Sequence, residues 1–303
     1  MKKIKFGIVG YGNLGKAVEE LLSVDLRFEL ICVFSSRDIT ARFCAAEKIE
    51  NLEAYKGKID LLFLCGGSSS TLTETAKKAV ENFNVIDAYD THKKIKKYIK
   101  DMNILAKNNK KVAFCCFGWD PGLFSLMRVL FIALDQQVFT SWGKGISQGH
   151  SEAVRNIENV EDAVQYTIPI KKVVSAIKKG QEASPSLHKR KCLIVAKKQH
   201  QKVIKNLVIN MPHYFKDYKT KVKFVNKKTL QKHKKLFHKG EVFTKGANFG
   251  FYLKTNSNPH LTAKIMIIYA VALNKFYLNK NFGAYSILDI PFSYLINNFD
   301  AYI

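Results

Sequence analysis

Residues 4–15 read IKFGIVGYGNLG, and this stretch decides the fold. Ile4 to Val9 is a short apolar run with β-branched residues, which is typical of a buried strand. It leads into Gly10-Tyr11-Gly12-Asn13-Leu14-Gly15, a G-x-G-x-x-G motif. Residues 16–23 continue with apolar side chains at helical spacing, and residues 28–34 (FELICVF) are typical of a second strand. In this strand–turn–helix–strand context the motif predicts a dinucleotide-binding site rather than a glycine-rich turn without function.

The three glycines of the motif have different expected roles. Gly10 permits the tight turn out of the strand, and Gly12 leaves room for a pyrophosphate to approach the backbone. Gly15 allows the helix to pack closely on the strand. The free N–H groups and the positive dipole end of the helix then favour the phosphates.

The end of the second strand bears on which nicotinamide cofactor is bound. NAD enzymes usually place an acidic residue about 20 residues past the glycines, where it bonds the ribose 2′-hydroxyl. Here the strand ends in Phe34-Ser35-Ser36-Arg37. Two hydroxyls and a guanidinium suit a 2′-phosphate, so we expect NADP. Two alternatives stay open. Arg37 is a solvated loop residue in the first, and NAD is the cofactor in the second, because the acidic Asp38 follows directly.

Three further strands are expected in the first half, at residues 59–65, 84–88 and 111–117, alternating with helices at 73–80 and 93–108. Together they predict an open, mostly parallel sheet. The third expected strand runs into a loop of small residues that should line the cofactor crevice, namely Cys65, Gly66, Gly67, Ser68 and Ser69.

Two carboxylates, Asp90 and Asp120, follow the last two of these strands. Both are expected on loops at the carboxyl edge of the sheet, where they would hold a positively charged group of a ligand. Because Asp120 precedes Pro121, an alternative role is to cap a helix over 121–134.

Composition limits the other classes of function. The net charge of +24 raises the possibility of nucleic-acid binding, but only six of the 49 basic residues are arginine, and the lysines are spread along the chain. The six cysteines form no CxxC pair, so we expect reduced thiols and no metal site. With no transmembrane or signal segment expected, the sequence predicts a cytoplasmic protein without a membrane partner.

Several motifs along nearly the whole chain resemble the meso-diaminopimelate dehydrogenase family. The most specific of them is Trp142-Gly143-Lys144-Gly145-Ile146-Ser147-Gln148-Gly149-His150-Ser151. The others are the glycine motif after Val9, Tyr89-Asp90-Thr91-His92, Gly118-Trp119-Asp120-Pro121-Gly122, residues 165–169 (QYTIP), residues 188–190 (HKR), residues 211–215 (MPHYF) and Asn258-Pro259.

The resemblance implies an enzyme that oxidises the D-centre of meso-2,6-diaminopimelate with NADP, releasing ammonia, in the biosynthesis of lysine and cell-wall precursors. Tyr11 to Leu14 would hold the pyrophosphate, and Ser35, Ser36 and Arg37 the 2′-phosphate. Asp90 and Asp120 would bind the ammonium of the reacting centre and are the catalytic candidates, although the identity of the general base stays open. The surrounding residues would be Trp119, Trp142, Ser147, Gln148 and Gly149. The distal L-centre would be held by Thr167, Arg190 and His238, with a polar contact from Asn258.

The expected fold is α/β, with a Rossmann-type parallel sheet over 1–118, completed by 266–303. An α+β substrate-binding and dimerisation domain with a mixed sheet is expected over 119–265, and the resemblance implies a homodimer. Its strands are expected near 138–143, 165–170, 192–196, 222–225 and 250–253, and a helix over about 260–279 returns to the first domain. Two alternatives remain: a related NADP-dependent amino-acid or semialdehyde dehydrogenase, and a non-catalytic nucleotide-sensing or nucleic-acid-binding protein.

Overall fold

The computed structural model describes residues 3–67, 71–134, 137–182, 186–212, 214–233 and 237–296. It divides into two compact units. The first unit comprises Met1–Leu126 and Pro259–Ile303, and the second comprises Met127–Asn258. The chain therefore leaves the first unit once and returns to it, and Ser68 and Ser69 lie outside the described residues.

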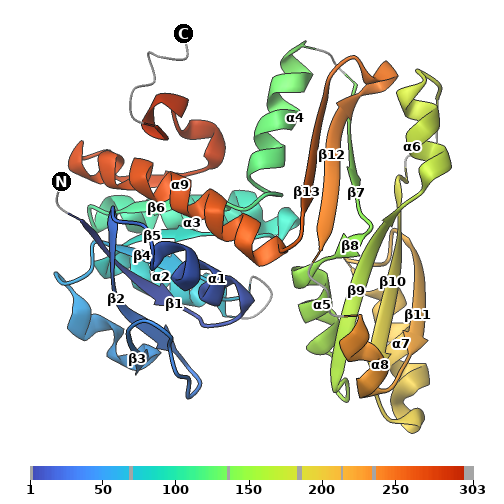
Figure 1. The fold of residues 1–303 in the computed structure, drawn as a ribbon, viewed down its shortest axis with the longest axis horizontal. Helices are drawn as coiled ribbons and strands as arrows, with labels where there is room; N and C mark the ends of the chain where they lie inside the picture. The colour runs from blue at the N-terminus through green and yellow to red at the C-terminus, as the bar shows by residue number, and fades with distance from the viewer. Residues whose placement is uncertain are drawn as a thin grey trace. The chain divides into compact units, whose positions relative to one another are not determined.

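The first unit is built on a seven-stranded sheet in which every neighbouring pair is parallel (Figure 1). The expected parallel sheet is confirmed, and the five expected strands are all present. Two edge strands were not expected, because AAEK and GAY are too short to show a pattern. In spatial order the strands are β14 (Gly283–Tyr285), β6 (Val112–Phe114), β5 (Asn84–Asp87), β4 (Leu61–Leu64), β1 (Ile4–Val9), β2 (Phe28–Ser35) and β3 (Ala45–Lys48).

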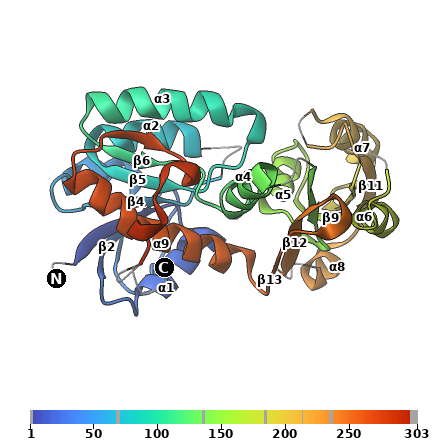
Figure 2. The ribbon, with the colours of Figure 1, turned by 90° about the horizontal axis from the view of Figure 1, so that it is seen from above.

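Helices cover both faces of this sheet (Figure 2). α2 (Leu72–Asn82) and α3 (Ile95–Asn108) lie on one face, and α1 (Asn13–Leu22) and α9 (Asn258–Leu278) lie on the other. α2 and α3 pack alanines, Val80 and Met102 against the strand side chains. On the opposite face, Phe276 of α9 packs edge-on against Phe114 of β6.

Helix α9 bears on the expectation that the chain has no transmembrane segment. Among the described residues it is the one helix that is long and apolar enough to cross a membrane. However, 56% of its most apolar window is buried inside the structure, and Tyr269 and Phe276 contact aromatic side chains of the sheet unit. Its apolar character is therefore explained by its position as a core helix of the first unit.

The second unit contains two sheets. The mixed, four-stranded sheet has the order β11 (Lys219–Phe224), β10 (His188–Val195), β9 (Asp162–Pro169) and β8 (Gly145–Ile146). The antiparallel, three-stranded sheet has the order β13 (Gly250–Thr255), β12 (His238–Thr244) and β7 (Val138–Trp142). The expected mixed sheet is thus present, but β7 and β13 belong to a separate sheet with β12, a strand that the sequence pattern did not reveal.

Three helices of the second unit, α5 (Gln148–Arg155), α7 (Gln201–Asn210) and α8 (Lys227–Lys232), pack on the two faces of the four-stranded sheet. The even-numbered residues Cys192 and Ile194 of β10 pack against the side of α7. The odd-numbered Leu193 and Val195 pack with Leu230 of α8 on the other face. The unit also contains α4 (Leu123–Leu134, which begins in the first unit) and α6 (Lys171–Lys178).

Candidate active site

The glycine loop between β1 and α1 has the geometry of a phosphate cradle. Gly10 has φ +94°, which favours glycine, and a Cβ at Gly15 would lie 2.1 Å from the Gly10 carbonyl oxygen. A Cβ at Gly12 would meet nothing within 4 Å, so the space above this residue is open. The first hydrogen bond within α1 runs from the Lys16 N–H to the Gly12 carbonyl, which leaves the preceding N–H groups directed out of the helix end.

Tyr11 of this loop is fixed by a buried carboxylate that the sequence reading did not single out. The Tyr11 hydroxyl donates to Glu19 of α1, and burial together with this hydrogen bond raises the pKa of Tyr11 to about 12. Glu19 also accepts the backbone N–H groups of Arg42 and Phe43, at 2.9 and 3.0 Å. A glutamate in an otherwise apolar helix face was the only sequence signal for this contact.

The residues expected at the 2′-phosphate follow the end of β2. Ser35 is buried, and its Oγ accepts the backbone N–H of Arg37 at 3.1 Å. Ser36 and Arg37 are exposed. The carboxylate of Asp38 pairs with Lys48 Nζ at 2.5 Å, and this neighbour lowers the pKa of Asp38.

The loop after β4 lies directly against the glycine loop. The Cys65 N–H donates to the Val9 carbonyl at 2.7 Å, and a Cβ at Gly10 would be 3.0 Å from the Gly66 nitrogen. Cys65 is buried, and burial raises the pKa of its thiol, so it is expected to remain a neutral thiol. The structure thus brings together the glycine motif, Cys65 and Gly66.

Asp90 and Asp120 lie on neighbouring loops of the same sheet edge. They follow β5 and β6, which pair in parallel, and the Phe117 N–H donates to the Asp87 carbonyl at 2.7 Å. Both carboxylates are half-buried. The backbone contacts between the two strand ends therefore bring the Asp90 and Asp120 loops next to each other, as expected.

A fully buried carboxylate, Asp87, links these two loops. It accepts the N–H groups of Tyr89 and Cys116, both at 2.9 Å, and the Tyr98 hydroxyl at 2.6 Å. Desolvation raises the pKa of Asp87 despite these donors. Its only sequence signal was an acidic residue at the end of an apolar strand, and its contacts indicate that it positions the Asp90 and Asp120 loops.

The helix that Asp120 was expected to cap begins two residues later than the expected 121. α4 begins at Leu123, so the residue before the helix is Gly122 rather than Asp120. The Gly122 N–H donates to Ser125 Oγ at 3.2 Å. Trp119, next to Asp120, is buried against Phe124 of the same helix.

In the second unit, the two expected carboxylate-binding residues Arg190 and Thr167 are direct partners across β10 and β9. The Arg190 guanidinium donates to Thr167 Oγ1 and lies 4.2 Å from the centre of the Tyr218 ring. Arg190 is 8% exposed, and its Nε has no hydrogen-bond partner. No carboxylate of the described residues pairs with Arg190, and burial lowers its pKa.

Two residues of the three-stranded sheet, Trp142 and His238, join Arg190 and Thr167 in one cluster of predicted site residues. Their rings pack edge-on at 6.1 Å, and a Cβ at Gly145 would lie 2.5 Å from the His238 ring. The Trp142 N–H donates to His188 Nε2 at 2.7 Å, so this nitrogen is deprotonated. Desolvation lowers the pKa of both His188 and His238 to about 4. His188 was noted only as part of the HKR motif at residues 188–190, and the sequence did not reveal its role.

The remaining substrate-binding predictions lie on two helix beginnings. Ser147 caps α5, and its Oγ lies 2.7 Å from His150 Nδ1. Gln148 and Gly149 form the first turn of this helix and are half-buried. Asn258 is buried at the first residue of α9 and takes no part in the Thr167–Arg190 pair.

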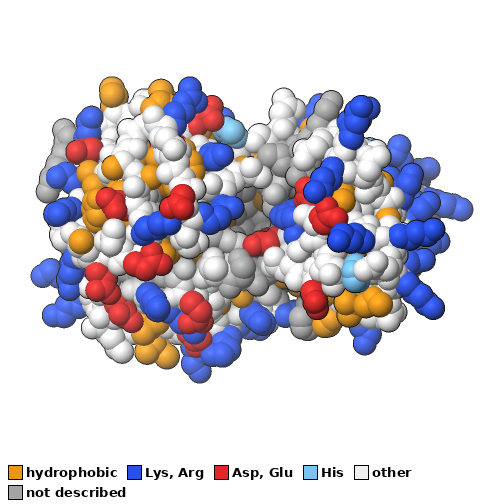
Figure 3. Space-filling model, turned by 90° about the horizontal axis from the view of Figure 1, so that it is seen from below, with side chains coloured by type: hydrophobic (Ala, Val, Ile, Leu, Met, Phe, Trp, Pro, Cys, Tyr) orange, Lys and Arg blue, Asp and Glu red, His pale blue; other side chains and the backbone are white. Residues whose placement is uncertain are grey.

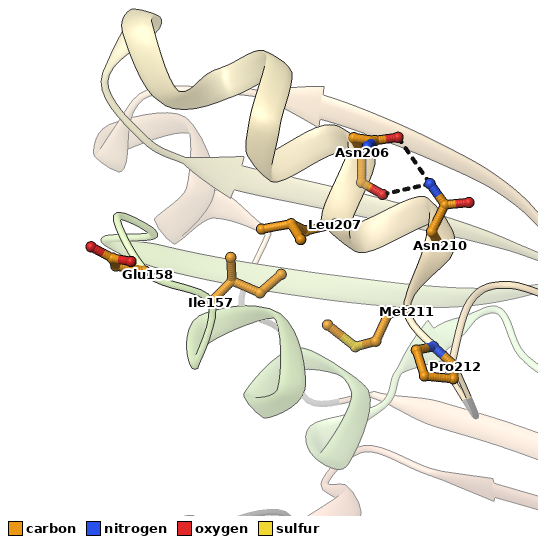
Figure 4. Close-up of a pocket in the computed structure, with 7 residues that line it drawn as sticks. All are labelled: Ile157, Glu158, Asn206, Leu207, Asn210, Met211 and Pro212. Carbon is orange, nitrogen blue, oxygen red and sulfur yellow. Dashed lines mark hydrogen bonds between the residues drawn. The ribbon is translucent and has the colours of Figure 1, made fainter.

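A separate hollow of about 400 Å³ lies between α7 and the residues after α5 (Figure 4). It contains none of the predicted site residues, and its amides Asn206 and Asn210 hydrogen-bond to each other. Glu158 is the only charged side chain among the described residues that line it, so the hollow does not suit a dicarboxylate. Its lining residues are Ile157, Glu158, Asn206, Leu207, Asn210, Met211 and Pro212.

Comparison with known proteins gives consistent matches, and those to whole relatives cover nearly the full chain. Residues 118–256 match the family model described as the diaminopimelic acid dehydrogenase C-terminal domain. The chain is 38% identical to meso-diaminopimelate D-dehydrogenase of Ureibacillus thermosphaericus, covering 97% of this chain and 96% of that protein. It is 34% identical to the enzyme of that name from Corynebacterium glutamicum, covering 100% and 99%.

Two solved structures have the same fold. The C. glutamicum diaminopimelate dehydrogenase in complex with diaminopimelate matches with a TM-score of 0.92 and 33% identity, over 99% of this chain and 98% of that chain. An engineered D-amino acid dehydrogenase bound to NADP⁺ matches with a TM-score of 0.92 and 31% identity, over the same shares.

Proposed function

This chain belongs to the meso-diaminopimelate D-dehydrogenase family, and on that premise we propose that it catalyses the NADP-dependent oxidative deamination of meso-2,6-diaminopimelate. The reaction takes place at the D-centre and gives L-2-amino-6-oxopimelate and ammonia. It is reversible, and the same site serves reductive amination in lysine and cell-wall precursor biosynthesis.

The observation that carries this proposal is the buried guanidinium of Arg190. A buried cation without an anionic partner is costly, and its unsatisfied Nε adds to that cost. A planar guanidinium matches a carboxylate in a bidentate geometry. A substrate carboxylate therefore supplies what this cluster lacks, and an amino acid with a carboxylate at its far end is the ligand that fits.

The other site residues divide by charge in the way that such a substrate requires. Asp90 and Asp120 bind the ammonium group of the reacting centre, where carboxylates on adjacent loops favour a cation. Thr167 and His238 join Arg190 at the distal carboxylate, and Asn258 adds a polar contact. The residues around the reacting centre are Trp119, Trp142, Ser147, Gln148 and Gly149.

The glycine loop fits a dinucleotide, since the open space above Gly12 and the N–H groups of α1 form a cradle for a pyrophosphate. Residues 10–15 and the loop at Cys65 to Ser69 hold this cofactor, and Ser35, Ser36 and Arg37 hold its 2′-phosphate. When bound, NADP supplies the acceptor for the hydride that leaves Cα of the D-centre.

The protein contributes orientation and proton transfer. Asp90 or Asp120 takes the proton that the amine loses as the C=N bond forms. Water adds to the resulting imine carbon, the C–N bond breaks, and ammonia leaves with the proton. Anchoring of the distal end by Arg190 and Thr167 selects the D-centre, because only one orientation places its Cα–H bond for reaction.

We also propose that the enzyme is a cytoplasmic homodimer. Helix α4 carries the exposed side chains Val129, Leu130, Ile132 and Leu134, and Tyr252 of β13 is exposed in the same unit. An exposed apolar surface of this kind is typical of a subunit interface. On the face that Figure 3 shows, acidic residues lie among the basic residues of the first unit, whereas the outer edge of the second unit carries basic residues alone. Only six of the 49 basic residues are arginine, which favours a solvated surface over a nucleic-acid site.

The test is absorbance at 340 nm with purified protein, NADP and meso-diaminopimelate. Controls contain the LL and DD isomers, or NAD in place of NADP. We expect a rate with the meso isomer and NADP, little rate with the LL isomer, and a much lower rate with NAD. Absence of a rate with every isomer, together with tight NADPH binding, would favour a related dehydrogenase with another substrate.

A further inference from the structure

The segment between β2 and β3 carries a second guanidinium, Arg42, in addition to Arg37. The start of this segment is fixed by the hydrogen bond from the Arg37 N–H to Ser35 Oγ. Its end is fixed by the two N–H groups of Arg42 and Phe43, which donate to Glu19. The start of the segment is therefore ordered by a contact to β2, and its end by contacts to α1, the helix that follows the glycine loop.

Glu19 couples this segment to the glycine loop itself. The same carboxylate accepts the hydroxyl of Tyr11, which stands between the first two glycines. Glu19 is 2% exposed, so the three donors converge on a buried carboxylate. The Arg42 backbone and the Tyr11 hydroxyl are thereby held by the same carboxylate.

The charges of the segment favour a polyanion over a neutral ribose. The cations of the segment are Arg37 and Arg42 and its acid is Asp38, while the neighbouring strand β3 adds Lys48 and Glu47. Asp38 is paired with Lys48, and Glu47 accepts the Asn51 amide at 2.9 Å. Among the described residues, neither guanidinium has a carboxylate partner. The Arg42 guanidinium instead lies 4.9 Å from the centre of the exposed Phe43 ring, a contact that limits its rotamers.

We propose that Arg42 is a second binding residue for the cofactor's 2′-phosphate, opposite Arg37, and that Glu19 positions it through the backbone of Arg42 and Phe43. A phosphate monoester carries close to two negative charges near neutral pH, so two guanidinium groups match it better than one. This inference rests on the proposed NADP dependence and extends it to the residues that discriminate NADP from NAD.

The test is calorimetric titration of the full-length protein, which requires no turnover. The variant is Arg42→Gln, and the ligands are NADPH, NADH, 2′,5′-ADP and 5′-ADP. Loss of one charge-assisted contact should weaken NADPH and 2′,5′-ADP binding by about ten- to a hundredfold. The affinities for NADH and 5′-ADP, which have no 2′-phosphate, should change by less than about twofold.

Two further variants test whether the loss of affinity is specific to the 2′-phosphate site. Arg37→Gln should show the same selective loss, whereas Arg27→Gln, an exposed arginine of the same unit paired with Asp25, should bind all four ligands as the wild type does. Unchanged NADPH affinity in Arg42→Gln, or equal losses for NADPH and NADH, would overturn the inference. If the wild type itself bound NADPH no better than NADH, the proposed NADP dependence would be wrong as well. A selective loss in a protein that does not oxidise meso-diaminopimelate would support Arg42 and count against the proposed substrate.

Discussion

The two units present their parts of the candidate site in different ways. In the first unit, the cradle is formed by consecutive residues, Gly10 to Gly15, and the contacts of each glycine follow from its place in the motif. In the second unit, Thr167, Arg190, Trp142 and His238 come from four strands in two sheets. A local motif determines the first arrangement, whereas strand register determines the second, so substitutions should affect them differently.

The largest effect is expected from a pair of glycines in the first unit. A Cβ at Gly15 would overlap the Gly10 carbonyl, so Gly15→Ala should lower the free energy of unfolding by at least about 3 kcal/mol. A Cβ at Gly12 would meet no atom within 4 Å, and its φ of −85° suits any residue. Gly12→Ala should therefore change the free energy of unfolding by less than about 1 kcal/mol. Its added methyl group should still weaken NADPH binding at least about tenfold, because it occupies the space of the pyrophosphate.

Urea unfolding and NADPH titration measure these two quantities separately. If Gly12→Ala bound NADPH normally, the open space above Gly12 would not be the phosphate cradle. If Gly15→Ala were as stable as the wild type, close packing of α1 on the loop would not be required.

The next effect concerns Arg190 in the second unit, where function and stability should move in opposite directions. Arg190→Met keeps the length of the side chain but removes the charge that binds the distal carboxylate. We expect kcat/KM for meso-diaminopimelate to fall on the order of a hundredfold, mainly through KM. Because the guanidinium is buried without an anion, the free energy of unfolding should stay unchanged or rise by about 1 kcal/mol. A large loss of stability with unchanged kcat/KM would identify Arg190 as a structural residue.

This contrast also explains what the sequence could predict. The β1–α1–β2 unit and its glycine roles were predicted because their signals lie within a few neighbouring residues. β3, β8 and β14 were missed because two to four residues show no period, and β12 (HKGEVFT) because its first half is polar. Arg190 and His238 were predicted as site residues only from the family resemblance, because their proximity depends on the register between strands that are distant in the sequence.

The supporting residues show the same limit. Glu19, Asp87 and His188 each hold two parts of the site together by hydrogen bonds to backbone N–H groups. In the sequence, Glu19 and Asp87 are acidic residues in or at the end of apolar segments, and His188 begins the basic run HKRK. Such a residue signals that some buried donor must be satisfied, but the identity of that donor is a property of the tertiary structure.

A smaller effect is expected from pH and His188. Its folded pKa of about 4 lies below the ordinary value of 6.5, so the unfolded chain takes up the proton first as the pH falls. The stability that His188 contributes is thus complete above about pH 6.5 and is lost as the pH falls towards 4. Protonation would also prevent Nε2 from accepting the Trp142 N–H.

Urea unfolding at pH 7 and pH 4.5 should therefore differ less in His188→Gln than in the wild type, by about 2 kcal/mol. The matched control is His260→Gln, because His260 is exposed and pairs with Glu20 in the first unit. If His188→Gln had the wild-type pH dependence, His188 would not be the buried neutral group that this site requires.

The smallest effect concerns the edge strand of the second unit. β11 carries Lys219, Lys221 and Lys223, and its register places Lys221 opposite Lys191 of β10 but Lys223 opposite Leu193. Lysines on an edge strand hinder pairing with other chains, but like charges opposite each other are destabilising. Lys221→Glu should therefore raise the free energy of unfolding by about 0.2–1 kcal/mol. Lys223→Glu changes the net charge equally without a cationic partner across the strand, and should have less effect. Urea unfolding at low salt measures the difference between the stability changes of the two variants. If its origin is electrostatic, 1 M NaCl should remove it. A difference that persists in salt would indicate packing instead.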